Sequence, residues 1–167
     1  MFEKIKGSAK SPARPAIPQI LNGLIGGFAG IGVVAYLAEV SNLPLLMAPF
    51  GATCVLLFAA PAAPLAQPRN VVLGHLIAAS VGLLVLNILG AGLFQMALGV
   101  GVAIALMQVF RAVHPPAGAN PLVVILGGVT DWWFLVTPVL IGALTLVLIA
   151  LVLNNLGKGK NWPVYWA

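Results

Sequence analysis

Six long apolar runs, separated by short polar or proline- and glycine-rich stretches, fill the chain from residue 20 onward. Each run is about 20 residues long, the length at which a helix crosses the hydrocarbon core of a bilayer. The pattern therefore predicts an all-α polytopic membrane protein. The runs cover residues 20–40, 43–63, 71–89, 92–110, 113–129 and 132–153.

Two of the runs, the second and the fifth, contain the same short motif of proline, glycine and a polar residue. It reads Pro49, Phe50, Gly51, Ala52 and Thr53 in the second run, and Pro116, Ala117, Gly118, Ala119 and Asn120 in the fifth. Proline and glycine at membrane depth leave backbone polar groups that lipid cannot satisfy, so irregular backbone persists there only inside protein or beside a cavity. The motif therefore predicts a binding site or a pore.

The motif also predicts how these two runs fold. A residue before proline is biased away from the helical region, so Asn120, which precedes Pro121, fits the N-cap of a helix, and Thr53 is its counterpart. The second and fifth runs are therefore predicted to be half extended and half helical. Helices that start at Pro49 and Pro116 are the alternative, and they would place Thr53 and Asn120 in the first turn. The sequence leaves this choice open.

The similarity between the two halves of the chain extends beyond the motif. Matching segments begin at positions 30 and 99, at 49 and 116, and at 85 and 152, so the second member of each pair follows the first at nearly the same distance along the chain. Near-constant spacing predicts two copies of a three-segment unit, at about 20–90 and 91–157. Three crossings are an odd number, so the second copy must be inverted relative to the first, as in many transporters.

Composition and charge set the class and the orientation. Hydrophobic residues make up 61% of the chain and charged residues 7%, against roughly 25% charged in soluble domains. All eight lysine and arginine residues fall on one side if the chain crosses six times, in agreement with the positive-inside rule. Re-entrant second and fifth runs would instead leave Arg69 and Arg111 outside. The sequence therefore predicts one transmembrane domain (20–157) with a cytoplasmic N-terminal segment (1–19) and C-terminal tail (158–167), in a bacterial inner (plasma) membrane.

The inverted arrangement would direct the starts of two half-helices toward the membrane centre. Each helix N-terminus carries unpaired amides and about half a positive charge, so two of them form a site for an anion or for a neutral polar solute. The absence of a buried lysine or arginine favours a small, weakly hydrated anion. The substrate is therefore predicted to bind near the midplane, between the two motifs.

The second motif also carries a resemblance to a known family. The eight-residue run from His114 through Pro115 and Pro116 to Pro121 follows shortly after Arg111. In this apolar context the run resembles the signature of the HPP family of small integral membrane proteins, and the similarity covers most of the chain. Members in cyanobacteria and chloroplasts are associated with nitrite transport. The resemblance therefore implies a permease or channel with nitrite as its substrate.

Candidate functional residues come from the two motifs and from polar side chains near them. The substrate-binding candidates are both five-residue motifs and His114, and the candidates for proton transfer or the pathway are His75, Arg111 and Gln108. His75 lies within a predicted span, where an ionisable residue is functional by default. The structural alternatives are hydrogen bonding between helices for His75 and support of the bend before the helix for His114. If transport is coupled to protons, one of these histidines must carry the proton.

Other classes of function find less support in the sequence. Neither histidine has a second ligand at metal-binding spacing, so no metal and no cofactor is predicted. The basic residues are scattered between apolar segments, which argues against nucleic acid. The protein is predicted not to be an enzyme, and an intramembrane enzyme with a histidine base is the weaker alternative. The expected partners are the small anion and the lipid bilayer, and the sequence leaves open whether a homo-oligomer forms.

Overall fold

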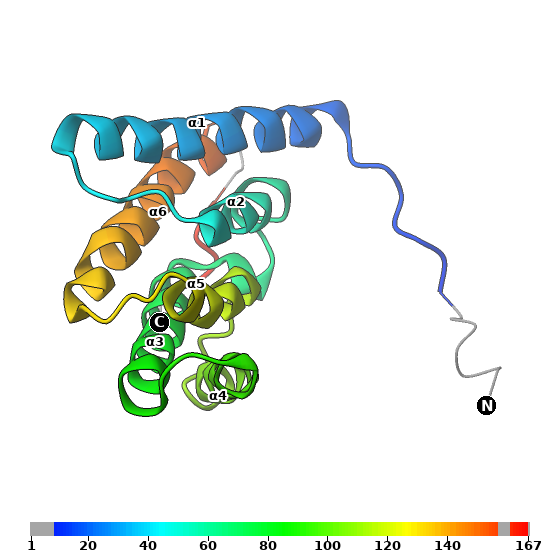
Figure 1. Cartoon of the computed structure of the whole chain (residues 1–167). Helices are drawn as coiled ribbons and strands as arrows, with labels where there is room; N and C mark the ends of the chain where they lie inside the picture. The colour runs from blue at the N-terminus through cyan, green and yellow to red at the C-terminus, as the bar shows by residue number, and fades with distance from the viewer. Residues whose placement is uncertain (1–8, 157–160, 167) are drawn as a thin grey trace.

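A computed structural model describes residues 9–156 and 161–166, and every regular element in these ranges is helical (Figure 1). The all-α prediction is confirmed. Three helical stretches are long and apolar enough to cross a membrane, and three apolar helices are shorter. Three helices begin and end close to the bounds that the apolar runs predict: α1 (Ile17–Ser41), α3 (Pro68–Leu89) and α4 (Leu93–Val109). The last helix, α6 (Ile141–Asn154), ends close to its predicted bound but begins well after residue 132.

The second and fifth runs are short helical segments, and the prediction of a half-extended backbone is wrong. In the second run, α2 (Ala48–Cys54) continues into the π-helix η2 (Val55–Ala59). In the fifth, the 3₁₀-helix η4 (Pro115–Ala119) continues into α5 (Asn120–Leu126). The prolines lie in the first turn of each segment, where proline has no intrahelical hydrogen bond to lose and its fixed φ suits a helix.

As a result, Thr53 and Asn120 lie within helical turns and are not N-caps. Asn120 has φ −60° and ψ −41°, values of a regular helix. The two helical segments, Ala48–Ala59 and Pro115–Leu126, are each about 18 Å long at 1.5 Å per residue. That is shorter than the bilayer core of about 30 Å, so the irregular chain on either side is needed for a crossing.

The last apolar run contains a break that the hydrophobic pattern does not reveal. The 3₁₀-helix η5 (Trp132–Leu135) and the π-helix η6 (Val136–Leu140) precede α6. Thr137, with φ −134° and ψ 115°, is extended. Pro138 follows it, and the residue before a proline is driven out of the helical region by steric contact with the proline ring.

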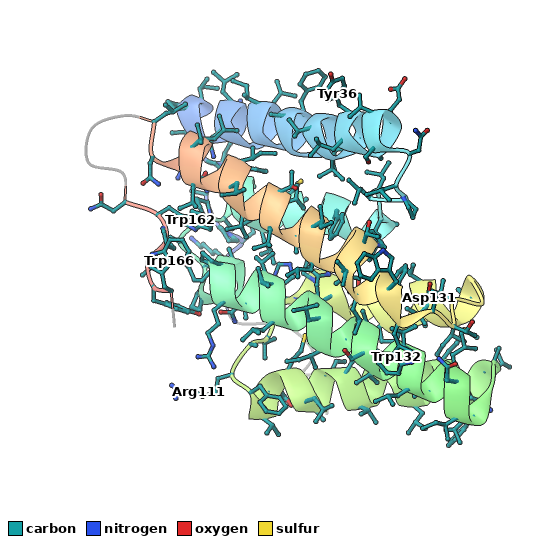
Figure 2. All side chains as sticks on the ribbon, turned by 90° about the vertical axis from the view of Figure 1, so that its left-hand side faces the viewer. Tyr36, Arg111, Asp131, Trp132, Trp162 and Trp166 are labelled. Atoms are coloured by element: carbon teal, nitrogen blue, oxygen red, sulfur yellow. The ribbon has the colours of Figure 1, made fainter. Side chains whose placement is uncertain are left out.

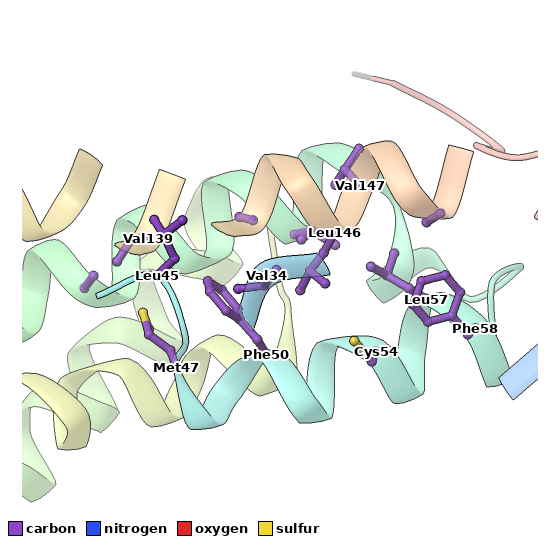
Figure 3. Packing of buried hydrophobic residues seen from close by; sticks show 14 of the residues in the cluster. Val34, Leu45, Met47, Phe50, Cys54, Leu57, Phe58, Val139, Leu146 and Val147 are labelled. Carbon is purple, nitrogen blue, oxygen red and sulfur yellow. The ribbon is translucent and has the colours of Figure 1, made fainter. Parts of the chain in front are cut away.

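The helices pack so that the first helix of each half meets the last helix of the other half. Helix α1 contacts α6, and α4 contacts α3, while the short segments α2 and α5 lie between these pairs (Figure 1). Buried apolar side chains form two clusters. Figure 3 shows the first, which includes Val34, Phe50, Leu57 and Leu146, and the second lies around Leu83 between α3, α4 and α5.

Two glycines make equivalent close contacts in the two halves. A Cβ atom added to Gly30 would lie 3.0 Å from Cys54 Sγ, and one added to Gly99 would lie 3.2 Å from Pro121 Cβ. Gly30 and Gly99 are matching positions of the two halves, and Cys54 and Pro121 each directly follow the last residue of their own motif. The first helix of each half therefore packs on its short segment at a matching place.

The two ends of the bundle differ in their side chains. Arg111, Trp162 and Trp166 lie toward one end, and Asp131 and Trp132 lie toward the opposite end (Figure 2). Of the predicted C-terminal tail, residues 161–166 pack on the bundle, and 158–160 and 167 lie outside the described residues. Trp162 is buried.

Backbone and side-chain hydrogen bonds hold this C-terminal segment in place. The Val164 amide donates to Gln67 Oε1 at 2.8 Å, and Tyr165 Oη lies 2.8 Å from Asn70 Oδ1. The Asn155 side chain hydrogen-bonds to both backbone groups of Trp162: Nδ2 donates to the carbonyl oxygen, and Oδ1 accepts from the amide. The segment is therefore fixed to the loop before α3, to the first turn of α3 and to the end of α6.

Candidate functional site

Four polar side chains meet inside the bundle and are fully buried. They come from four different elements: Thr53 from α2, His75 from α3, His114 from the turn before η4, and Asn120 from the start of α5. Two of them belong to the first half of the chain and two to the second. All four are candidates that the sequence nominates separately, and the fold brings them together.

The Thr53 hydroxyl lies at the centre of this cluster. Its Oγ1 is 2.9 Å from His75 Nε2 and 3.0 Å from His114 Nε2. The Pro49 carbonyl oxygen lies 3.2 Å away, one helical turn earlier. The imidazole centroids of His75 and His114 are 5.0 Å apart, with their planes inclined by 64°. One hydroxyl therefore bridges two histidine rings.

Asn120 closes the cluster on the far side of His75. Its Nδ2 donates to the His75 carbonyl oxygen at 3.0 Å. The same amide places Nδ2 at 3.1 Å and Oδ1 at 3.3 Å from His75 Nδ1. The contact with the carbonyl fixes the orientation of the amide, because the reverse orientation would set two acceptor oxygens against each other.

His114 is held by a carbonyl group in the loop before α3. Its Nδ1 donates to the Leu65 carbonyl oxygen at 2.8 Å. Leu65 belongs to the 3₁₀-helix η3 (Pro64–Ala66). Gln67, which is fully buried, braces this loop by donating to the carbonyl oxygens of Pro61 and Ala63.

Two supporting residues, Gln67 and Asn70, are not candidates from the sequence. Both lie just before the predicted start of the third span at residue 71, where polar residues ordinarily indicate an exposed loop. Asn70 is buried and donates from Nδ2 to the Val113 carbonyl oxygen at 2.9 Å, next to His114. The sequence offers no signal for these contacts, because their acceptors are backbone groups.

Close packing lets His114 approach α3. A Cβ atom at Gly74 would lie 2.7 Å from His114 Cβ and 3.0 Å from the Ala112 carbonyl oxygen. Phe50 approaches His75 from another element, α2, with ring centroids 5.2 Å apart in an edge-on geometry. The cluster therefore depends on the missing side chain of a glycine and on contact with an aromatic ring.

The remaining candidates lie outside the cluster. Arg111 and Gln108 are exposed, as are Gly51 and Ala52. Apolar residues of both motifs line an open groove of about 720 Å³ between α2 and the η4–α5 segment, and they include Pro49, Ala52, Pro116 and Ala119. Of the other two residues of the second motif, Ala117 is buried and Gly118 is partly buried. Over residues 9–156 and 161–166, no group of three potential metal ligands occurs.

Sequence comparison places this architecture in a family. The profile of the HPP transmembrane region matches residues 12–163. The chain belongs to the HPP family. Two similar proteins from Dictyostelium discoideum, each named only as a transmembrane protein, are 38% and 36% identical to it over 99% and 96% of its length. The chain of this HPP protein spans 57% and 60% of the length of these two relatives. No solved structure is detectably similar to the chain.

Proposed function

We propose that this HPP protein is a permease or channel for a small monovalent anion, most simply nitrite. The observation that carries the proposal is the buried cluster of Thr53, His75, His114 and Asn120 inside an apolar bundle. Polar and ionisable side chains are costly within a membrane, and where they occur they mark substrate, ion or proton pathways. The resemblance of the His114–Pro121 run to HPP proteins associated with nitrite transport supports the choice of anion.

The proposal includes an internal symmetry. The two halves would be inverted repeats, so that α2 and the η4–α5 segment enter from opposite sides and meet near the midplane. The equivalent contacts of Gly30 and Gly99 support this symmetry, as does the direct contact between α2 and η4. An anion would then pass between the two motifs and meet donors from both halves.

A neutral polar solute is the second candidate, and one feature of the cluster favours it. With both histidines neutral, each of the four side chains carries hydrogen-bonding groups without a net charge. Such a set can replace part of the hydration shell of an uncharged solute. An enzyme is the weaker alternative, because the Thr53 hydroxyl, although it lies beside two imidazoles, is fully buried.

Uptake into proteoliposomes separates these functions. Purified protein in liposomes is expected to accelerate nitrite uptake above the background of protein-free liposomes, with saturation at high nitrite. Osmotic swelling in small neutral solutes is measured on the same vesicles. Swelling without nitrite uptake would show that the substrate is a neutral solute and not an anion. The absence of both fluxes would reject transport of either kind.

Cysteine labelling tests the proposed six crossings. In a Cys54→Ala background, a cysteine at position 69 or 111 is expected to react with a membrane-impermeant maleimide only from the cytoplasmic side. A cysteine at position 131 should react only from the opposite side, because Asp131 lies at the other end of the bundle from Arg111 (Figure 2). Labelling of positions 69 and 131 from the same side would contradict the topology.

A further inference from the structure

We propose that His75, Thr53 and His114 form a relay that carries a single proton through the cluster and couples it to substrate movement. The coupling rests on the proposed transport function, whereas the relay rests on the geometry of the three side chains. Thr53 Oγ1 lies within hydrogen-bonding distance of Nε2 in both rings, at 2.9 and 3.0 Å. A hydroxyl both donates and accepts a hydrogen bond, which is what a proton relay between two bases requires.

The hydrogen positions of the resting cluster follow from its acceptors. The Leu65 carbonyl can only accept, so His114 Nδ1 carries a hydrogen and, in the neutral ring, Nε2 is an acceptor. The Thr53 hydroxyl has one hydrogen and two acceptors within reach, His114 Nε2 at 3.0 Å and the Pro49 carbonyl oxygen at 3.2 Å. In the relay it donates to His114 Nε2, the nearer of the two, and its lone pair accepts from His75 Nε2–H. His75 Nδ1 is then an acceptor and receives a hydrogen bond from Asn120 Nδ2. All hydrogen bonds in this series point from Asn120 toward Leu65.

This polarity defines a balanced proton transfer. A proton that arrives at His75 Nδ1 gives an imidazolium. The Nε2–H bond of His75 then breaks as its proton moves to Thr53 Oγ1, while the hydroxyl proton of Thr53 moves to His114 Nε2. The positive charge is now on His114, and Thr53 is again a neutral hydroxyl. Loss of the Nδ1 proton of His114 on the Leu65 side completes the passage of one proton.

Asn120 is placed to serve both forms of His75. Before the transfer, Asn120 Nδ2 donates to the unprotonated Nδ1 at 3.1 Å. After it, His75 retains a hydrogen on Nδ1, and Asn120 Oδ1 at 3.3 Å can accept it. A small rotation of the Asn120 amide therefore satisfies either tautomer of His75. This property is expected of a group beside a proton carrier, whereas a histidine that never changes its protonation would not need it.

The surroundings supply no other charge to the cluster among the residues that the structure describes. The nearby elements contribute four titratable groups besides the histidines. Cys54 of α2 is buried against Gly30, and Arg69 of α3 donates to the Phe110 carbonyl oxygen. Arg111 is exposed, and Tyr165 lies against Asn70. Both described carboxylates, Glu39 and Asp131, are exposed. Two imidazolium rings this close would repel each other in an apolar setting, so the pair accepts one proton at a time.

Nuclear magnetic resonance of the histidine nitrogens tests the relay without any substrate. The chain contains only two histidines, so ¹⁵N-histidine labelling of the full chain, purified with a histidine-free tag, reports the cluster alone. At high pH we expect His75 to carry its hydrogen on Nε2 and His114 on Nδ1. On acidification the two rings should respond together to one shared proton. Independent titration of the rings, or the opposite tautomers, would overturn the relay.

Substitutions at Thr53 test the bridging hydroxyl. Thr53→Val removes the hydroxyl at nearly constant volume and is expected to separate the two rings into independent titrations, whereas Thr53→Ser should preserve the shared response. Val55→Thr, which adds a hydroxyl at a 63% exposed position of the adjoining η2, is the matched control. A shared response that persists in Thr53→Val would show that the hydroxyl does not connect the rings.

Proton flux tests the coupling. Proteoliposomes that contain a trapped pH-sensitive dye are given nitrite, with protein-free liposomes as the background. We expect proton entry with nitrite in the wild type and in Thr53→Ser, and a ratio of proton to nitrite that falls toward zero in Thr53→Val. Nitrite uptake without proton entry in the wild type would overturn the coupling and leave transport standing. A shared titration without nitrite uptake would reject the transport function and leave the relay standing.

Discussion

Replacement of Asn120 by leucine is expected to lower the initial rate of nitrite uptake about ten-fold or more. The Asn120 amide donates to the His75 carbonyl and contacts His75 Nδ1, and leucine keeps the branching at Cγ, with bulkier methyl groups, while removing both interactions. A buried polar group without a partner costs about 1–3 kcal/mol, and about 1.4 kcal/mol corresponds to a factor of ten. Uptake is compared at equal amounts of reconstituted protein.

The matched control for this substitution lies outside the groove between the two motifs. Leu148 belongs to α6 and is 61% exposed, so Leu148→Ala should leave uptake within about two-fold of the wild type, as expected for an exposed position away from specific contacts. Thermal unfolding in detergent, followed for both variants, distinguishes lost folding from lost transport. Equal losses of uptake in folded Asn120→Leu and Leu148→Ala would show that the cluster is not part of the transport pathway.

A substitution away from the polar side chains should have the second-largest effect, on stability. A Cβ atom at Gly142 would overlap the Phe50 ring, and Phe50 is fully buried against His75. Gly142→Ala is therefore expected to destabilise the protein by about 1–3 kcal/mol, the usual cost of overpacking a tight core. A lower midpoint of thermal or denaturant unfolding would show it.

Two further variants make this expectation specific. Gly32 lies in α1, and a Cβ atom there would have no neighbour within 4 Å. Gly32→Ala should therefore be neutral or slightly stabilising, because alanine is the better helix former. Phe50→Leu combined with Gly142→Ala should recover part of the lost stability by making room for the new methyl group. Similar midpoints for Gly142→Ala and Gly32→Ala would contradict the packing argument.

The apolar runs of the sequence are sufficient to locate most of the long helices but not the local irregularities of the backbone. The third run, predicted at 71–89, is α3 at Pro68–Leu89, and the fourth, predicted at 92–110, is α4 at Leu93–Val109. The first helix begins at Ile17, within the segment assigned to the N-terminal tail. The sequence offers a helix that starts at the motif proline only as an alternative, because proline is compatible both with the first turn of a helix and with an extended chain.

The candidate site could be predicted residue by residue but not as an assembly. Thr53 and Asn120 follow from the doubled motif, and His75 and His114 from their position in apolar segments. That one hydroxyl contacts both rings depends on how α2, α3 and the turn before η4 pack, which local sequence does not encode. The Leu65 carbonyl is a backbone group, so no side-chain pattern could have identified it as the acceptor for His114.

The cluster is asymmetric with respect to the proposed repeat. The alignment that matches the two motifs also matches His75 with Gly142, and Phe50 with Ala117. One half therefore has an imidazole where the other has a glycine covered by a phenyl ring. The same alignment matches His114 with Met47, so each half supplies one histidine at a position where the other half has an apolar residue or a glycine. If the halves are inverted copies, the two histidines break the symmetry, and forward and reverse transport need not be equivalent.

The hydrogen bonds that join the C-terminal segment to the loop before α3 and to the first turn of α3 also bear on biosynthesis. Gln67 Oε1 receives the Val164 amide, and Asn70 lies against Tyr165, across 97 and 95 residues of chain. During translation this loop leaves the ribosome long before its partners exist. The support for the Leu65 carbonyl, and with it the final position of His114, is thus completed only after both halves have been synthesised and inserted, which makes closure of the cluster a late step of membrane assembly.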